Sequence, residues 1–523
     1  MFKYLKNDIP ASIVVFFVAL PLCLGIALAS GAPPFAGMIA GIIGGIVVGT
    51  LSGSQIGVSG PAAGLAAIVL TAITSLGGYE NFLVAVVIGG VIQIVFGILK
   101  AGVIGYYFPN SVIKGMLVGI GIIIILKEIP YFFGYDKATG GQFSFFKVEF
   151  ESLFTPIINS IGNPSLGPLF IGVFALLLII FWDNVLAKKA KIFTLIQGPF
   201  AAVVLGVLYT VITMGNETWG ILSNHLVKVP IPDSFDSFLG QFRFPNFSVI
   251  TKTEIWVTGF TIALVASLET LLCVEATDKI DPRKRVTPTN RELLAQGAGN
   301  ILSGLVGGLP ITQVIVRSSA NIQSGGQTKL SAIIHGFLLL ISVITIPNLL
   351  NLIPYSVLAA ILLIVGYKLA HPSKFKKMFS LGWKQWVPFL ITVILIVATD
   401  LLLGIGVGLA VGIIIVLVKS YQNSHFLHIK ETDTKFHKVK MDLAEELTFF
   451  NKGAIMRELE ALPKDTYLEI DAVKTRYLDN DIIEVLEDFI EKAKNRNIQI
   501  KLISDQGVLD NPSSFIEIFK SKS

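Results

Sequence analysis

The sequence contains little charge and little cysteine for its length. Only 15% of its 523 residues are Asp, Glu, Lys or Arg, whereas 53% are hydrophobic, and its mean hydropathy is +0.72. Soluble domains carry charge on about a quarter of their residues, so this composition excludes an ordinary soluble enzyme. The two cysteines, Cys23 and Cys273, lie in apolar segments and provide neither a disulfide framework nor a metal site. We expect no cofactor and no nucleic-acid partner.

Long apolar segments recur up to about residue 420 and predict an α-helical integral membrane protein. The first of them contains Pro10 and Pro21 and leads into further spans, so we expect a retained helix rather than a cleaved signal peptide. We expect about fourteen segments, at 10–29, 33–51, 60–76, 80–99, 111–129, 166–183, 194–214, 254–275, 292–307, 311–323, 328–346, 354–370, 385–400 and 402–420. Two of them, 61–76 and 311–323, are too short to cross a hydrocarbon core of about 30 Å.

The basic residues predict the orientation in the membrane. They gather in the connections that an even number of spans places on the N-terminal side, at Lys3, Lys6, Lys188, Lys189, Lys191, Lys279, Arg283, Lys284, Arg285, Arg291, Lys374, Lys376, Lys377 and Lys384. The long opposite loops, 131–165 and 215–253, are poorer in Lys and Arg for their length. Positive residues favour the cytoplasmic side, so we expect both the N-terminus and the C-terminal tail to be cytoplasmic in a multi-pass protein of the plasma membrane.

An internal repeat is indicated by the two short segments. Residues 58–64 read VSGPAAG and residues 307–313 read GGLPITQ, with Pro61 and Pro310 separated by 310 − 61 = 249 positions. Pro21 in the first span and Glu269 in the eighth are separated by 269 − 21 = 248 positions. A duplication with seven spans in each copy places the second copy upside down in the membrane. Paired interrupted helices at matching positions of inverted halves are typical of a transporter's binding site.

The two short segments favour an anion as the ligand. A helix that begins inside the membrane has unpaired N–H groups in its first turn and about half a positive charge at that end. Two such ends, near Ala62 and Ala63 and near Gln313, Val314 and Ile315, would hold one small anion near the midplane. These residues are therefore the candidate substrate-binding residues.

Arg317 is the remaining candidate for substrate binding. It follows Pro310 by seven residues, which is about 10 Å along a helix. From there it would pair with Glu269 or add a positive field to the anion site. The alternative is an arginine that extends to the cytoplasmic face.

Glu269 is a carboxylate inside the apolar stretch 256–274, where insertion costs roughly 2.5–3.5 kcal/mol. Three roles remain open for it: it takes up a proton when the anion binds, it binds Na⁺ beside the anion, or it forms a permanent salt bridge to Arg317 or Lys329. We assign Glu269 and its neighbour Thr270 as the candidate ion-coupling residues.

Several motifs together resemble the SulP family of anion transporters. They are DIPAS at 8–12, ALP at 19–21, SGP at 59–61, SLET at 267–270, NREL at 290–293, QGAGN at 296–300, GGLP at 307–310 and RSSAN at 317–321. The resemblance implies a seven-plus-seven inverted repeat with core and gate domains, usually as a homodimer, and a substrate site between the third and tenth segments. In the sodium-coupled bicarbonate branch an Asp and nearby Thr residues bind Na⁺. Here Glu269, Cys273 and Ile315 occupy those positions, so the resemblance favours H⁺.

The tail changes to a soluble composition after residue 430. Strands are predicted at 436–443, 467–470 and 498–503, and amphipathic helices at 451–462 and 481–495. This alternation predicts a small α/β domain over 430–523, after a transport domain over 1–425, and it resembles a STAS domain. The turn at 479–481 has no Ser, so a phosphorylation switch there is not expected.

These features predict a secondary active transporter of a small inorganic anion, sulfate or bicarbonate, rather than an enzyme. An uncoupled anion channel, a membrane sensor that signals through its tail, and a nucleobase permease of the same architecture remain alternatives.

Overall fold

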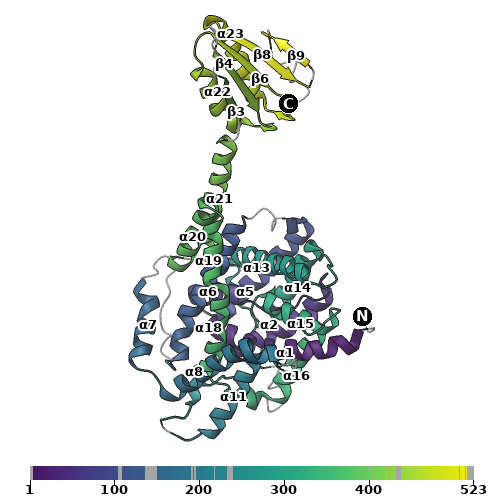
Figure 1. Ribbon diagram of the computed structural model, residues 1–523. Coiled ribbons are helices and arrows are strands. Elements are labelled where there is room, and N and C mark those ends of the chain that lie inside the picture. Colours follow the sequence, from purple (N-terminus) through teal and green to yellow (C-terminus); the bar gives the residue numbers. More distant parts are fainter. Residues whose placement is uncertain are drawn as a thin grey trace. The chain divides into compact units, whose positions relative to one another are not determined.

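The computed structural model describes residues 4–103, 109–135, 150–189, 193, 196–216, 218–231, 240–399, 401–422, 425–430, 437–505, 507–512 and 514. The chain divides into two compact units, Met1–Leu409 and Ala410–Ser523. The first unit is helical and the second contains a mixed sheet (Figure 1). The helix α21 (Leu401–Gln422) runs across the division between the units.

The first unit contains two successive sets of apolar helices. The first set comprises α1 (Leu5–Ala29), α2 (Pro34–Ile43), α4 (Ala66–Ser75), α5 (Tyr79–Ile98), α6 (Asn110–Phe132), α8 (Leu166–Phe181) and α11 (Gly198–Ile212). The second comprises α13 (Thr253–Ile280), α14 (Thr289–Leu305), α15 (Ile315–Gln323), α16 (Leu330–Thr345), α18 (Tyr355–Leu369), α20 (Trp383–Ala398) and α21. Within the described ranges, six helical stretches are long and apolar enough to cross a membrane, and five more are shorter.

The packing of these helices has the symmetry of an inverted repeat. Helix α5 of the first set packs against α13 and α14, and its counterpart α16 packs against α1 and α2. Likewise α8 packs against α18, whereas α20 packs against α6, and α6 and α18 pack against each other. Exchanging the two sets maps each of these contacts onto another. The chain is therefore an α-helical membrane protein built as an inverted repeat, as the sequence predicts.

Both short segments begin as strands and continue as helices. Strand β1 (Ser59–Pro61) pairs antiparallel with β2 (Ile311–Gln313), in the register Ser59↔Gln313, Gly60↔Thr312 and Pro61↔Ile311. The 3₁₀ turn η3 (Ala63–Leu65) and α4 follow β1, and α15 follows β2. The expectation of two half-helices is confirmed. The sequence did not predict that their entering segments pair, which satisfies backbone groups that lie far from water.

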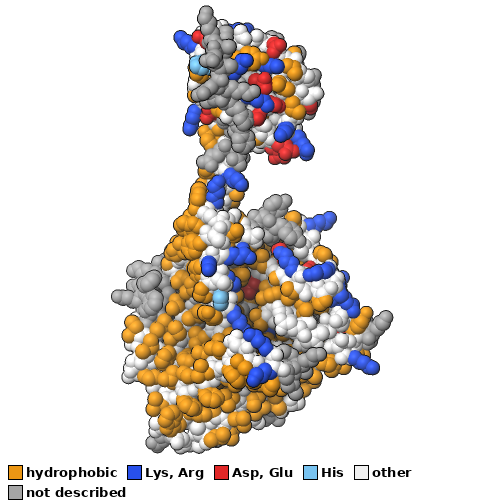
Figure 2. Space-filling model, in the orientation of Figure 1, with side chains coloured by type: hydrophobic (Ala, Val, Ile, Leu, Met, Phe, Trp, Pro, Cys, Tyr) orange, Lys and Arg blue, Asp and Glu red, His pale blue; other side chains and the backbone are white. Residues whose placement is uncertain are grey.

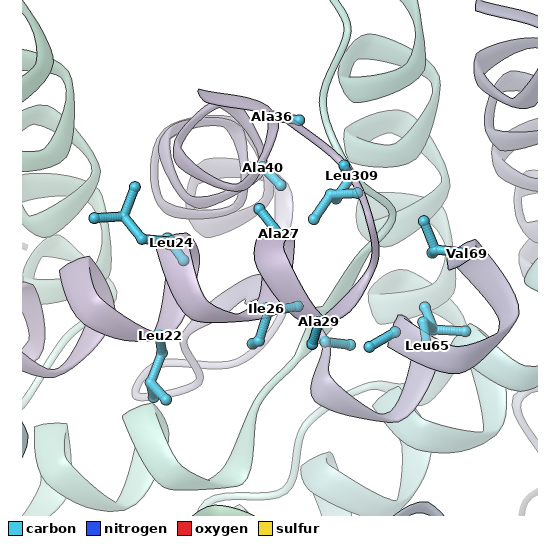
Figure 3. Packing of buried hydrophobic residues seen from close by; sticks show 14 of the residues in the cluster. Leu22, Leu24, Ile26, Ala27, Ala29, Ala36, Ala40, Leu65, Val69 and Leu309 are labelled. Carbon is cyan, nitrogen blue, oxygen red and sulfur yellow. The ribbon is translucent and has the colours of Figure 1, made fainter. Parts of the chain in front are cut away.

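Small residues allow the helices of the first unit to pack closely. In Figure 3, Leu65 and Val69 of the first half-helix lie by the end of α1 at Ala29, and Leu309 lies by Ala36. The backbone N–H of Leu309 donates to the carbonyl of Ala36 at 3.2 Å. Hydrophobic side chains also cover much of the visible surface of this unit (Figure 2), as a lipid-facing surface requires.

The second unit contains a five-stranded sheet in the order β3-β4-β6-β8-β9. Its strands are β3 (His425–Lys430), β4 (His437–Leu443), β6 (Thr466–Asp471), β8 (Gln499–Ser504) and β9 (Gly507–Asp510). The central strands β4, β6 and β8 are parallel, and the outer two are antiparallel to their neighbours. The helices α22 (Lys452–Ala461) and α23 (Asn480–Asn495) supply much of its core, and β5 (Glu446–Leu447) pairs with β7 (Tyr477–Leu478) beside them.

Neighbouring strands of this sheet are tied by an ion-pair bridge. Lys440 on β4 lies 2.8 Å from Asp442 and 2.8 Å from Asp471 on β6. These hydrogen bonds, first to Asp442 and then to Asp471, raise the pKa of the Lys440 ammonium. Asp479 caps α23 by accepting from the N–H of Asp481. The turn at 479–481 therefore serves to start this helix.

Several expectations about element bounds needed adjustment. The strand expected at 436–443 is described from His437, because residue 436 lies outside the described residues. The short helices α7 (Phe150–Gly162) and α19 (Pro372–Ser380) and the outer strands β3 and β9 were not predicted. Helices α7 and α19 are amphipathic, so a search for long apolar spans passes over them, and β9 is short and exposed on both faces.

Candidate functional site

The two half-helices begin at opposite ends of the antiparallel pair β1–β2. Ala62 is extended, with φ −102° and ψ 126°, and the helical turn starts at Ala63. Val314 is extended, with φ −117° and ψ 120°, and α15 starts at Ile315. Pro61 has no backbone N–H to donate to a preceding helical turn, so the first segment enters in an extended conformation. The residues predicted to bind substrate therefore lie at two helix N-termini joined through one antiparallel pair.

Helix α13 lies across both helix starts. The N–H of Gly64 faces the carboxylate of Glu269, and the N–H of Gln313 donates to Thr270 Oγ1 at 3.2 Å. The N–H of Ile315 faces the sulfur of Cys273. Three side chains within little more than one turn of α13 thus contact the N-terminal ends of both half-helices. Glu269 occupies the positive end of the first helix, where a carboxylate is electrostatically favoured.

Gly64 is required for this contact. A Cβ built on Gly64 would lie 2.6 Å from Glu269 Oε2, which is closer than real Cβ atoms approach. Glu269 is partly exposed as a residue, but its Oε2 atom is buried and has no hydrogen-bond partner among the residues described. One carboxylate oxygen is therefore left to take up a proton or another ligand.

The predicted site residues divide into an accessible and a buried group. Ala63, Val314, Ile315 and Glu269 are partly exposed, and so is Cys273. The buried ones are Ala62, Thr270, Gln313 and Arg317. The partly exposed residues lie at the two helix starts, and among the buried ones Thr270 accepts from the backbone N–H of Gln313.

Arg317 is fully buried, in the first turn of α15. Its Nη2 donates to Cys23 Sγ on α1 at 3.4 Å, while its Nε and Nη1 have no partner in the described part of the chain. A Cβ on Gly60 would lie 2.1 Å from Nη1, so the guanidinium lies directly against β1. A buried cation with unsatisfied donors is costly unless an anion or water approaches it.

Glu269 forms no salt bridge with either predicted partner in the described structure. Arg317 contacts Cys23 instead, and Lys329 Nζ donates to the carbonyl of Thr50 at 2.6 Å. The interpretation of Glu269 as a permanent ion pair is wrong for this conformation. The reason is that Glu269 lies next to Gly64 at the start of the first half-helix, whereas Arg317 packs against Gly60 of β1.

An amide network supports the second strand. Asn300 on α14 accepts from the N–H of Ile311 at 2.5 Å and donates to the carbonyl of Ile311 at 3.1 Å. The same amide donates to Gln93 Oε1 at 2.6 Å, and Gln93 donates to Ser267 Oγ at 3.3 Å. The network connects β2 to α13 two residues before Glu269. Sequence reasoning included Asn300 only as part of a motif, and its contact with β2 is visible only in three dimensions.

Comparison with known proteins decides the family. The family model described as the sulfate permease family matches residues 5–395, which is most of the chain and all of the site. The chain belongs to the sulfate permease family. This family consists of transporters, and the chain is a multi-pass membrane protein.

Two similar proteins match nearly the whole of this chain. The bicarbonate transporter BicA of Picosynechococcus is 25% identical over 99% of this chain and 92% of its own length. Sulfate transporter 4.1, chloroplastic, of Arabidopsis thaliana is 24% identical over 96% of this chain and 75% of its own length.

Solved structures show the same fold. The murine Slc26a9 anion transporter in the inward-facing state superposes with a TM-score of 0.76 at 15% identity, covering 96% of this chain and 86% of that one. At this identity the likeness establishes the architecture but not the ligand.

Proposed function

We propose that the protein is a secondary active transporter that moves a small inorganic anion, sulfate or bicarbonate, across the plasma membrane by alternating access, coupled to H⁺. The observation that supports it best is the position of Glu269 on the N–H of Gly64. In our proposal the anion binds between the two helix starts, at Ala62, Ala63, Gln313, Val314 and Ile315, with Arg317 adding positive charge from behind β1.

The position of Glu269 provides a simple coupling mechanism. An ionised carboxylate at the first helix start occupies the positive end that the anion needs and also repels the anion. Protonation removes the charge, so the anion and the proton enter together. Thr270 keeps the second helix start in register by accepting from the N–H of Gln313.

Na⁺ is the competing coupling ion. A sodium site needs several oxygen ligands, but the residue one turn after Glu269 is Cys273, whose sulfur is a poor ligand for a hard cation. We therefore favour H⁺. We further propose a homodimer, with the N-terminus and the STAS-like domain in the cytoplasm and a boundary between residues 425 and 430.

Uptake by proteoliposomes tests the function. The purified protein should accumulate labelled sulfate or bicarbonate when an inward H⁺ gradient is imposed, and a Na⁺ gradient alone should not substitute. Conductance without dependence on either gradient would instead indicate a channel. Uptake of uracil without uptake of either anion would indicate a nucleobase permease.

Blocking the space between the helix ends tests the position of the anion. Ala63→Leu places a larger side chain at a partly exposed position, and we expect it to abolish uptake while the protein still folds. Ala62→Leu is the comparison, because Ala62 is buried and overpacking there costs about 1–3 kcal/mol of stability. Normal uptake by Ala63→Leu would place the anion elsewhere.

A further inference from the structure

A cavity of about 380 Å³ lies at the end of α13, away from the half-helices. Its apolar lining comes from Leu271, Leu272 and Val274 of α13 and from Val286 in the following loop. Its basic lining comes from Lys279, Lys284 and Arg285. Its acidic lining comes from Glu275 and Asp278. The cavity thus combines an apolar wall with charged residues of both signs, on the membrane side where basic residues gather.

Most charges around the cavity are already paired. Lys279 pairs with Glu275 on α13, and Arg285 lies 2.7 Å from Asp281. The acidic lining residue Asp278 accepts from the N–H and the hydroxyl of Thr287 at 2.7 and 2.8 Å. The charges of Lys279 and Arg285 are therefore compensated by carboxylates, whereas Asp278 keeps its negative charge and has its oxygens satisfied by neutral donors.

Lys284 is different from the other lining cations. Its Nζ donates to the backbone carbonyl of Lys279 at 2.6 Å, and no carboxylate within the described structure pairs with it. The backbone at Lys284 is left-handed, with φ 51°, a conformation unusual for a residue with a side chain. The loop thus holds a cation at the cavity with an uncompensated charge.

Exposed apolar side chains surround the same place. Gly102 of the cavity wall follows the end of α5, where Ile98 is 66% exposed and Leu99 71% exposed. Val286 in the wall itself is 84% exposed. Apolar side chains next to lysines are typical of the boundary between acyl chains and headgroups. A free inorganic anion would gain nothing from these apolar contacts.

We propose that this cavity binds the headgroup of an anionic phospholipid. The phosphodiester lies at Lys284, and the glycerol and upper acyl carbons lie along Val286 and the apolar wall of α13. Basic pockets between helices on the cytoplasmic side are suited to such headgroups. The site is separate from the transport site, and its test requires no transport measurement.

Native mass spectrometry of the full-length protein tests the site. The protein is titrated with phosphatidylglycerol and, separately, with phosphatidylcholine of the same chain length. We expect retention of phosphatidylglycerol in preference to phosphatidylcholine. Lys284→Gln should lower the affinity for phosphatidylglycerol about fivefold, the effect of one cation near an anionic headgroup. Lys377→Gln is the matched control, because Lys377 is an exposed lysine of α19 outside the cavity, and it should change nothing.

Two further arms separate a lipid from a free phosphate. Val286→Ser should weaken the retention of phosphatidylglycerol, because it removes an apolar contact at an exposed position. Inorganic phosphate should fail to displace the lipid. Displacement by inorganic phosphate would overturn the lipid assignment in favour of a free-anion site. Equal retention by Lys284→Gln and Lys377→Gln would overturn the site itself.

Discussion

The first half-helix begins with residues 61–64, PAAG, whereas the second begins with residues 311–315, ITQVI, and continues to Arg317. We call these two helix starts the first and the second entrance. The first entrance offers no polar side chain, and its N–H group at Gly64 contacts Glu269 of α13. The second entrance carries polar side chains and a buried guanidinium. The two entrances thus differ in side chains although both run from a strand into a helix, and we propose that they have separate roles. We assign proton coupling to the first and anion attraction to the second.

The largest expected effect comes from removing the charge at the first entrance. Glu269→Gln resembles the protonated carboxylic acid, so the protein should fold but lose the stimulation of uptake by an H⁺ gradient. Coupling free energies of about 1–3 kcal/mol correspond to a loss of about 5–150-fold. Uptake is measured in proteoliposomes at several imposed gradients.

Glu275→Gln is the matched control for this experiment, because Glu275 lies on the same helix and is exposed. It should retain the stimulation. An unchanged gradient response in Glu269→Gln would remove the coupling role from the first entrance.

The next largest effect concerns the charge at the second entrance. Arg317→Met keeps the approximate shape of a buried side chain without its charge, and such replacements are often neutral or stabilising for folding. We expect KM for the anion to rise at least about tenfold, or about 1.4 kcal/mol, with little change in Tm. Arg317→Lys should recover part of the affinity. A fall in Tm with an unchanged KM would mean that Arg317 is structural.

Substitution of two glycines, Gly60 on β1 and Gly64 in η3, tests the two entrances independently. A Cβ on Gly64 meets Glu269 Oε2 at 2.6 Å, and a Cβ on Gly60 meets Arg317 Nη1 at 2.1 Å. Each Gly→Ala change should cost about 1–3 kcal/mol through overpacking. We expect Gly64→Ala to shift the pH dependence of uptake and Gly60→Ala to raise KM.

Gly406→Ala is the control for both changes, because its Cβ would meet open space. The same shift in both variants, whether in pH dependence or in KM, would show that the entrances do not act separately.

The smallest effect is expected in the support of the second entrance. Asn300→Asp keeps the acceptor for the N–H of Ile311 but loses the donor to Gln93 and to the Ile311 carbonyl. Leaving buried acceptors unpaired costs about 1–3 kcal/mol of stability. We expect a lower Tm together with slower uptake, measured on the same preparation.

Asn351→Asp is the matched control for Asn300→Asp. Asn351 makes the same two-bond contact with the backbone of Val229, at 2.6 and 2.7 Å, in a connection away from β2. It should lower Tm without changing uptake per folded molecule. Equal effects on uptake would show that Asn300 contributes only stability.

The sequence by itself determined the membrane class, most helix positions and the presence of one interrupted segment at the matching position of each half. These follow from local signals: apolar length, proline at a helix start, and charge outside the spans. Glu269 was also identifiable, because a carboxylate in an apolar helix is costly wherever the helix packs.

Only the tertiary structure decided which groups meet. Whether Glu269 faces Arg317, Lys329 or a helix end depends on how α13 rotates against β1 and β2, and no local periodicity encodes that rotation. The same holds for the two-bond contact of Asn300 with Ile311 and for the burial of Arg317 against Gly60. The sequence supplied the chemical groups. Packing between the two halves decided that the carboxylate lies at Gly64 in the first half-helix and the guanidinium at Gly60 on β1.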